Sequence, residues 1–215
     1  MNYKDKFLEI FSFFIKGKSL EGTTEEHRNG KYFKKEKDGI KRIIWYKNGQ
    51  LHRENGAAFI RSGGGFDTIK EWYQNGLIHN DNGPAMITKS PYGKWTKEWY
   101  KDGELHRDGD DPAIINSSEE NYWYKNGHLH RDHGPAIIKQ NSKHWYKNGV
   151  LHREDGPAVQ SPQIKGFYRE PGEEWWINGK QLTKEEFNIF ISYKNLDKEL
   201  PNKNNDKIQG KKLKI

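Results

Sequence analysis

The chain has 215 residues, of which 32% are apolar and 31% are charged, so it cannot bury a thick conventional core. It contains no cysteine, which excludes disulfides, thiolate metal sites and a cysteine nucleophile. The net charge of +7 comes from the ends, because residues 1–43 and 198–215 each carry +4 whereas 44–197 carry −1, and this argues against a nucleic-acid groove along the body.

The first predicted element is an amphipathic helix at the N-terminus. Its apolar side chains fall on one helical stripe made of Phe7, Phe11, Phe14 and Ile15. The run resembles a signal peptide, but Glu9 interrupts it and lysines follow where cleavage requires small residues. We predict that residues 1–22 form a cap over one sheet edge, with a membrane-surface anchor as the alternative. No apolar run is long enough to span a membrane, and we expect an intracellular, non-secreted protein.

Residues 23–182 are predicted to form an array of tandem repeats. The unit reads Trp-Tyr-x-Asn/Asp-Gly-x-Leu/Ile-His-Arg/Asn-Glu/Asp and continues into Gly-Pro-Ala, or a close variant, and a short apolar stretch. The five units begin at Trp45, Trp72, Trp99, Trp123 and Trp145, and a sixth, divergent unit begins at Trp175. A half unit precedes them at 27–30. The spacing between Gly-Pro-Ala and the next Trp varies. Turn-forming stretches such as 62–65 and 90–93 account for the difference, as surface loops do.

Asn-Gly or Asp-Gly between short β-prone runs predicts a tight hairpin, because both turn residues must tolerate positive φ. A two-residue turn at 48–49 pairs Tyr46 with Leu51 and Trp45 with His52. Since side chains alternate along a strand, Trp and His share one face, and Tyr and Leu share the other. We therefore predict a mainly β fold, an antiparallel meander of tandem β-hairpin repeats that forms an open twisted sheet with a capping helix at each end.

The pattern Trp-Tyr-x-Asn-Gly-x-Leu-His-Arg-x-x-Gly-Pro-Ala resembles the MORN-like repeat proteins of large DNA viruses and phages. The resemblance extends over 27–187. It implies a strand-rich repeat fold, a viral source, and roles in membrane tethering, dimerisation or scaffolding.

A histidine follows the first tryptophan of each of the five full units by seven residues, and this row could be mistaken for metal ligands or general bases. With two strands of about 4.8 Å per repeat, neighbouring members lie about 10 Å apart and cannot share one ion. The sixth unit carries leucine in this position, which favours a packing role. We assign the following structural repeat positions: Trp45, His52, Trp72, His79, Trp99, His106, Trp123, His130, Trp145, His152, Trp175 and Leu182.

The His-Arg-acid sequence could also be interpreted as an acid–base cluster. An enzyme needs one unique set of groups in a pocket, whereas this set recurs in five units, with Asn80 in place of Arg in the second. We therefore expect no catalytic residues, no metal site and no cofactor.

The tyrosine that follows each motif tryptophan is the better candidate for contacting a partner. The candidate partner-binding residues are Tyr46, Tyr73, Tyr100, Tyr124 and Tyr146. Tyrosine on a solvated sheet face is a rigid, amphipathic contact residue. The alternative is that Tyr and Leu only pack the second face of the sheet.

The C-terminal end carries a capping box, formed by Thr183 and Glu186, before an apolar run. It predicts a capping helix over 183–197. The basic, Lys- and Asn-rich segment 198–215 is expected to be disordered.

These features predict a non-catalytic repeat protein that acts as a protein-binding scaffold or interaction module. The alternative is a peripheral membrane or lipid-associated module that uses the basic termini, and an enzyme ranks third. We expect a protein partner before a membrane surface and do not expect nucleic acid. The sequence leaves the partner and the oligomeric state open.

Overall fold

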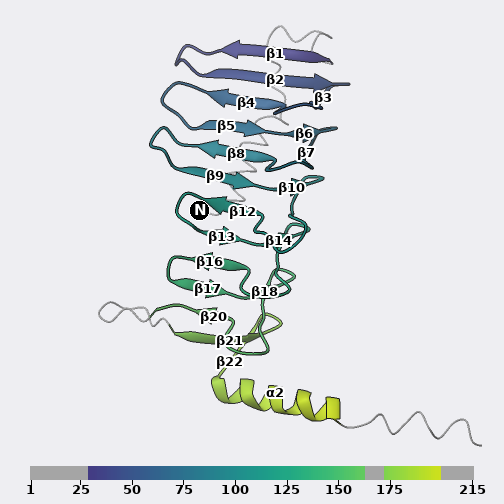
Figure 1. Ribbon diagram of the computed structural model, residues 1–215, viewed down its shortest axis with the longest axis vertical. Coiled ribbons are helices and arrows are strands. Elements are labelled where there is room, and N and C mark those ends of the chain that lie inside the picture. The colour runs from purple at the N-terminus through teal and green to yellow at the C-terminus, as the bar shows by residue number, and fades with distance from the viewer. Residues whose placement is uncertain (1–28, 163–171, 200–215) are drawn as a thin grey trace, which may run out of the picture.

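The computed structural model, described for residues 29–162 and 172–199, is a long ladder of strands with a helix across one end (Figure 1). One antiparallel sheet of 14 strands follows the chain in the order β1-β2-β4-β5-β8-β9-β12-β13-β16-β17-β20-β21-β22, and β3 joins it through β2. The mainly β, open meander predicted from the sequence is therefore confirmed. The helix predicted over 1–22 lies outside the described residues, as does the tail from residue 200.

The main sheet contains β1 (Gly30–Lys35), β2 (Lys41–Lys47), β3 (Gln50–Leu51), β4 (Phe59–Ser62), β5 (Thr68–Glu71), β8 (Met86–Lys89), β9 (Trp95–Glu98), β12 (Ile114–Asn116), β13 (Asn121–Tyr122), β16 (Ile137–Lys139), β17 (Ser142–His144), β20 (Val159–Gln160), β21 (Glu173–Ile177) and β22 (Lys180–Leu182). Separate two-stranded ribbons are formed by β6 (Tyr73–Gln74) with β7 (Leu77–Ile78), β10 (Tyr100–Lys101) with β11 (Glu104–Leu105), β14 (Tyr124–Lys125) with β15 (His128–Leu129), and β18 (Tyr146–Lys147) with β19 (Val150–Leu151). The helix is α2 (Lys184–Glu199).

The segments between the motifs form most of the main sheet. The turn-forming stretches 62–65 and 90–93 connect β4 to β5 and β8 to β9, as expected of surface loops. In the first segment between motifs, Phe59–Ser62 pairs with Thr68–Glu71 in an antiparallel register that sets Ile60 opposite Lys70. Short runs with β-branched and aromatic residues favour strand structure. The glycines at 63–65, all with positive φ, turn the chain between these two strands.

The motif hairpins have the predicted turn and register. Asn48 and Gly49 have φ values of 52° and 74°, and Tyr46 pairs with Leu51. Positive φ at both turn residues matches a type I′ turn. Successive hairpins do not pair strand to strand as expected. The backbone bonds between the first two repeats are from Gly76 N–H to the Leu51 carbonyl at 2.8 Å and from Arg53 N–H to the Tyr73 carbonyl at 3.2 Å.

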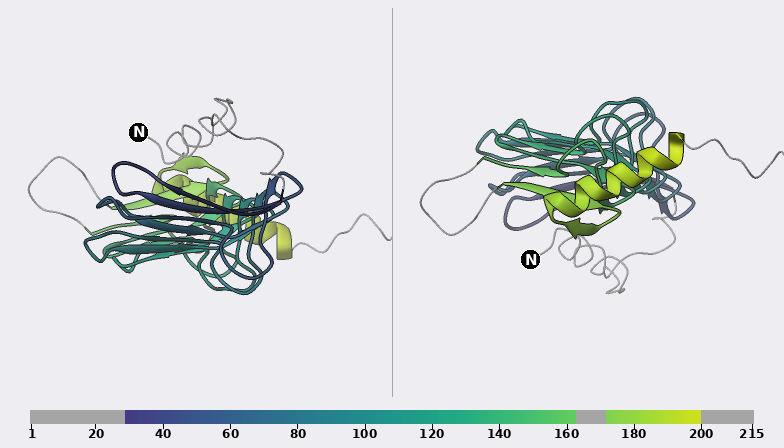
Figure 2. Two further views of the ribbon diagram at one scale, coloured as in Figure 1. Left: turned by 90° about the horizontal axis from the view of Figure 1, so that it is seen from above. Right: turned by 90° about the horizontal axis from the view of Figure 1, so that it is seen from below.

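The motif tryptophan is the residue at which the chain changes hydrogen-bonding partner. Trp72 donates its backbone N–H to the Ala85 carbonyl at 2.8 Å, within the sheet region, while its own carbonyl accepts the N–H of His79 at 2.9 Å, within the hairpin. The hairpins and the loops after them therefore leave the sheet and curl to one side (Figure 2). The alanines at the junctions are fully buried, namely Ala58, Ala85, Ala113, Ala136 and Ala158.

The C-terminal helix begins as predicted. Thr183 N–H donates to Glu186 Oε2 at 2.7 Å, and Glu186 N–H donates to Thr183 Oγ1 at 3.1 Å, which confirms the capping box. Helix α2 lies against β21 and β22 and buries Phe187. It continues to Glu199, two residues past its expected end. No helix among the described residues is both long enough and apolar enough to cross a membrane.

Candidate binding surface

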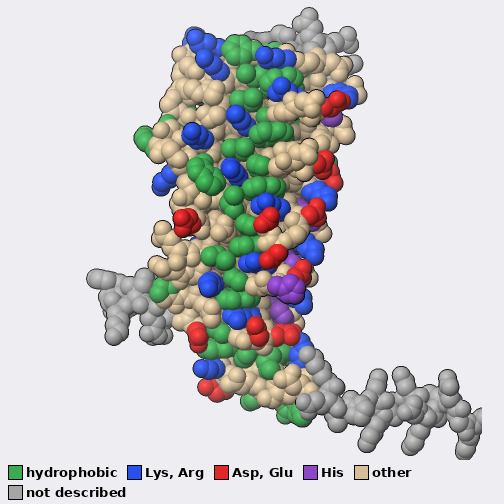
Figure 3. Space-filling model, viewed as in Figure 1, with side chains coloured by type: hydrophobic (Ala, Val, Ile, Leu, Met, Phe, Trp, Pro, Cys, Tyr) green, Lys and Arg blue, Asp and Glu red, His purple; other side chains and the backbone are tan. Residues whose placement is uncertain are grey.

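A loop follows each motif hairpin and returns the chain to the main sheet. The stack of these loops, called the loop column here, comprises 52–57, 79–84, 106–112, 130–135 and 152–157. Acidic and histidine side chains gather along one long side of the molecule, and a band of hydrophobic side chains runs beside them (Figure 3).

The histidine row links each repeat to the next. The Nδ1 atom of each motif histidine accepts the backbone N–H of the first turn residue of the following hairpin, at 3.0 to 3.2 Å. The five donor–acceptor pairs are Asn75 with His52, Asp102 with His79, Asn126 with His106, Asn148 with His130, and Asn178 with His152. Asn29 plays the same role at the start of the array, because its Oδ1 accepts the N–H of Asn48 at 2.9 Å.

In the fourth repeat, where Nδ1 of a neutral His130 accepts the Asn148 N–H, the ring proton lies on Nε2. His130 Nε2 then faces Asp132 Oδ1 at 2.9 Å. This hydrogen bond, with the charge of Lys125, lowers the pKa of the Asp132 carboxyl. Because the sixth repeat has Leu182 in this position, the sequence predicted that the motif histidine serves for packing and that leucine is equivalent to it. The structure shows why Leu182 differs: it belongs to the last hairpin, after which α2 follows and no further turn needs an acceptor.

The motif arginine stacks on the motif tryptophan and hydrogen-bonds to the loop backbone. In the fourth repeat, the guanidinium carbon of Arg131 lies 4.0 Å from the centre of the Trp123 ring, and Nη1 donates to the Pro135 carbonyl at 3.4 Å. The first, third and fifth repeats have the same stack, with distances of 3.8 to 4.0 Å. The second repeat has Asn80 instead, and its Nδ2 reaches the Pro84 carbonyl at 2.9 Å.

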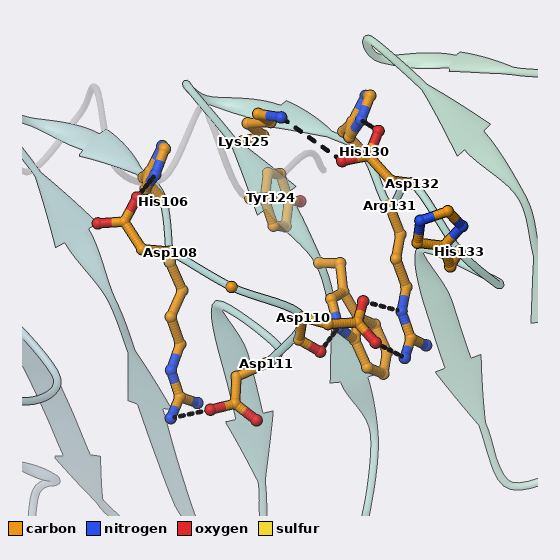
Figure 4. Close-up of a pocket in the computed structure, with 13 residues that line it drawn as sticks. His106, Asp108, Asp110, Asp111, Tyr124, Lys125, His130, Arg131, Asp132 and His133 are labelled. Carbon is orange, nitrogen blue, oxygen red and sulfur yellow. Dashed lines mark hydrogen bonds and ion pairs between the residues drawn. The ribbon is translucent and has the colours of Figure 1, made fainter.

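A cavity of about 570 Å³ lies between the loops of the third and fourth repeats (Figure 4). The extra residue of the third loop shapes it. The Asp110 carboxylate forms a bidentate ion pair with Arg131, at 2.7 and 2.8 Å. The backbone carbonyl of Asp110 accepts Trp123 Nε1–H at 2.9 Å. A smaller cavity of about 340 Å³ lies between the loops of the second and third repeats. The first cavity is thus a variant of a groove that recurs along the loop column.

Charged groups that line the two cavities pair with one another, as Lys101 does with Asp108 at 3.1 Å and Lys125 with Asp132 at 3.5 Å. Among residues 29–162 and 172–199, no group of three or more His, Asp or Glu side chains could hold a metal ion.

The tyrosine row lies against the core and does not form an exposed contact surface. Tyr73 is 5% exposed and packs with Ile78 between Ala58 and Ala85, and the other four tyrosines are partly buried. Tyr73 and Tyr100 donate their hydroxyl hydrogens to Glu71 and Glu98, at 3.0 and 2.8 Å. Burial raises the pKa of both carboxyls, although the tyrosine hydrogen bonds oppose this shift. The structure therefore favours the packing alternative for these tyrosines.

A second surface was missed from the sequence because it lies on strands between the motif hairpins, whose pairing was not predicted. The strand register aligns a continuous row of side chains across the main sheet, consisting of Phe33, Ile43, Ile60, Lys70, Ile87, Lys97, Ile115, Asn121, Ile138, Lys143, Gln160 and Glu173. We call this side of the sheet the lysine–isoleucine face. It is the side of the motif tryptophans, because residues two apart on a strand point the same way. The alternation of Ile with polar residues between glycine turns was the available sequence signal.

The chain matches no protein-family model, and no curated protein gives a significant match to it.

Proposed function

We propose that this protein is a non-catalytic scaffold of the MORN-like repeat type that presents an extended surface to a protein partner inside the cell. One observation carries the proposal: the polar motif groups are engaged in bonds within and between repeats. Each motif histidine binds the next turn, and the arginines of four repeats bind their own loops. Because the motif histidines and arginines form the same bonds in successive repeats, their recurrence supports a structural role. A long ladder of repeats offers an extended surface on which a partner can dock.

A second candidate is a peripheral membrane module, with a viral source common to both candidates. It is favoured by the charge distribution, since the two ends carry +4 each while the repeat body carries −1. Basic segments bind anionic lipid surfaces with a strength that decreases as salt is added.

The test compares the full chain with a variant that lacks 198–215, at low and physiological salt. Each is assayed for capture of proteins from a host-cell lysate and for sedimentation with vesicles of phosphatidylcholine, with or without phosphatidylserine. The scaffold proposal expects a captured protein that is retained by both chains at both salt concentrations. Binding to phosphatidylserine vesicles that is lost with the deletion and with salt, without any specific captured protein, would replace it with the membrane module.

A further inference from the structure

We propose that the lysine–isoleucine face, over strands β1 to β9, docks an acidic amphipathic helix of a protein partner. This inference rests on the proposed scaffold function and names the surface and the partner chemistry.

The main sheet separates charge between its two sides, although the repeat body is close to neutral. Following the register, the strand residues on the lysine–isoleucine face include nine lysines and one acid, Glu173. Those lysines are Lys31, Lys35, Lys41, Lys47, Lys70, Lys89, Lys97, Lys143 and Lys180. The strand residues on the opposite side include four basic residues, Lys34, Arg42, Arg61 and Lys139, and three acids, Glu71, Glu98 and Glu174. The lysine–isoleucine face is therefore the basic side of the main sheet.

Seven of the nine lysines belong to β1 through β9, so the charge is concentrated on the N-terminal half of the face. Lys47 pairs with Glu54 at 3.0 Å, and none of the other six forms an ion pair with a carboxylate of the described chain. Two of them lie near tryptophan rings instead, Lys31 at 5.8 Å from the Trp45 centroid and Lys97 at 5.2 Å from that of Trp95. These cations are available to an acidic partner.

Partly exposed aliphatic side chains separate the lysines of the central row. Ile60 and Ile87 lie on either side of Lys70, and Ile87 also separates Lys70 from Lys97. A complementary partner must supply carboxylates and aliphatic groups in turn along the long axis of the ladder. A surface with a desolvated apolar centre and charged neighbours is typical of protein interfaces.

The spacing favours a helix as the partner. Lys70 and Lys97 lie two strands apart, which corresponds to about 9.6 Å. Residues seven apart on an α-helix lie on one side of it and are separated by about 10.5 Å. A helix lying across the strands can therefore place a glutamate near each lysine and leucines between them. Single-stranded nucleic acid fits less well, because its bases need aromatic stacking platforms and the row is mostly aliphatic. A membrane fits less well because the lysines interrupt the apolar row.

The test uses the full chain and a synthetic helical peptide of three heptads whose one face carries Leu and Glu. The controls are the same peptide with Lys for Glu, phosphatidylserine vesicles, and a single-stranded oligonucleotide. Binding is measured by fluorescence anisotropy for the peptides and the oligonucleotide, and by sedimentation for vesicles.

The variant is Lys70→Glu with Lys97→Glu. The charge-matched control is Lys125→Glu with Lys147→Glu, on hairpin ribbons β14 and β18. Melting curves verify that each variant folds.

We expect the wild-type chain to prefer the acidic peptide and the Lys70/Lys97 variant to lose about tenfold in affinity or more, corresponding to at least ~1.4 kcal/mol. The control variant should stay close to wild type. Failure of the acidic peptide to bind, equal loss in both variants, or a preference for vesicles or oligonucleotide would overturn the docking assignment. If the lysate partner still binds the Lys70/Lys97 variant, this inference fails while the scaffold function stands. If no specific protein is captured by the wild-type chain, the scaffold function itself fails.

Discussion

His130 accepts the backbone N–H of Asn148, 3.1 Å away and in the next repeat, through its Nδ1 atom. The two residues are 18 positions apart, and the same bond recurs at every boundary between consecutive motif repeats. The motif histidine therefore contributes to the coupling between repeats, on which the stability of such arrays depends.

We predict that His130→Leu lowers the melting temperature, because it removes this bond and the contact with Asp132. One hydrogen bond contributes about 1 kcal/mol. Trp123→Ala should cost more, about 3–5 kcal/mol, since the ring is 7% exposed. His128→Leu is the control, because His128 is exposed on the same hairpin. Equal melting temperatures for His130→Leu and His128→Leu would show that the bond between repeats contributes nothing.

The second repeat offers a stabilising substitution, Asn80→Arg. The other four repeats place an arginine over the tryptophan and against the loop carbonyl, so arginine at 80 should stack on Trp72 in the same way. The expected gain is about 0.5–1 kcal/mol, seen as a higher melting temperature. Asn80→Ala should lower it, because Asn80 bonds both the Pro84 carbonyl and the Asn82 N–H. If Asn80→Arg behaves like Asn80→Ala, the stack does not transfer between repeats.

Glu98→Gln should stabilise the protein at neutral pH. Burial raises the pKa of Glu98 above its unfolded value of 4.5, so its contribution to stability is fully present below that pH and is lost as pH rises through the folded pKa. Glutamine keeps an acceptor for Tyr100 without the charge. The gain in melting temperature should therefore appear near pH 7 and shrink towards pH 4.

Glu120→Gln is the matched control with the opposite sign. The hydrogen bond from Tyr122, at 2.8 Å, lowers the pKa of Glu120, so its ionised form stabilises the fold above pH 4.5, and this contribution is lost as pH falls through the folded pKa. This substitution should lower the melting temperature at neutral pH. The same response from both variants would contradict the two assignments.

Gly127→Ala tests the turn geometry alone. Gly127 has φ of 72°, and an added Cβ would meet nothing closer than Glu104 Cβ at 3.9 Å. The cost is therefore conformational, about 1–2 kcal/mol. Gly172→Ala, where φ is not positive and nothing lies within 4 Å, should be neutral or slightly stabilising. Urea unfolding of the two variants should give clearly different midpoints, and equal midpoints would argue against the type I′ turn.

The sequence by itself determined the local geometry. Asn-Gly pairs select a turn with positive φ, which fixes the pairing of Tyr46 with Leu51, and Thr183 with Glu186 starts the C-terminal helix. These features depend on residues within a few positions of one another, whose backbone preferences can be read directly.

Tertiary structure alone decided which strands form the sheet and what each repeat offers its neighbour. The chain changes partner at each motif tryptophan, so the hairpins of the second to fifth repeats leave the sheet and the segments between the motifs form it. That change places His130 beside Asn148, buries Tyr73, and aligns Lys70 with Ile60 and Ile87. Such contacts join residues of different strands and repeats, and no local preference encodes them, because they exist only once the repeats have stacked.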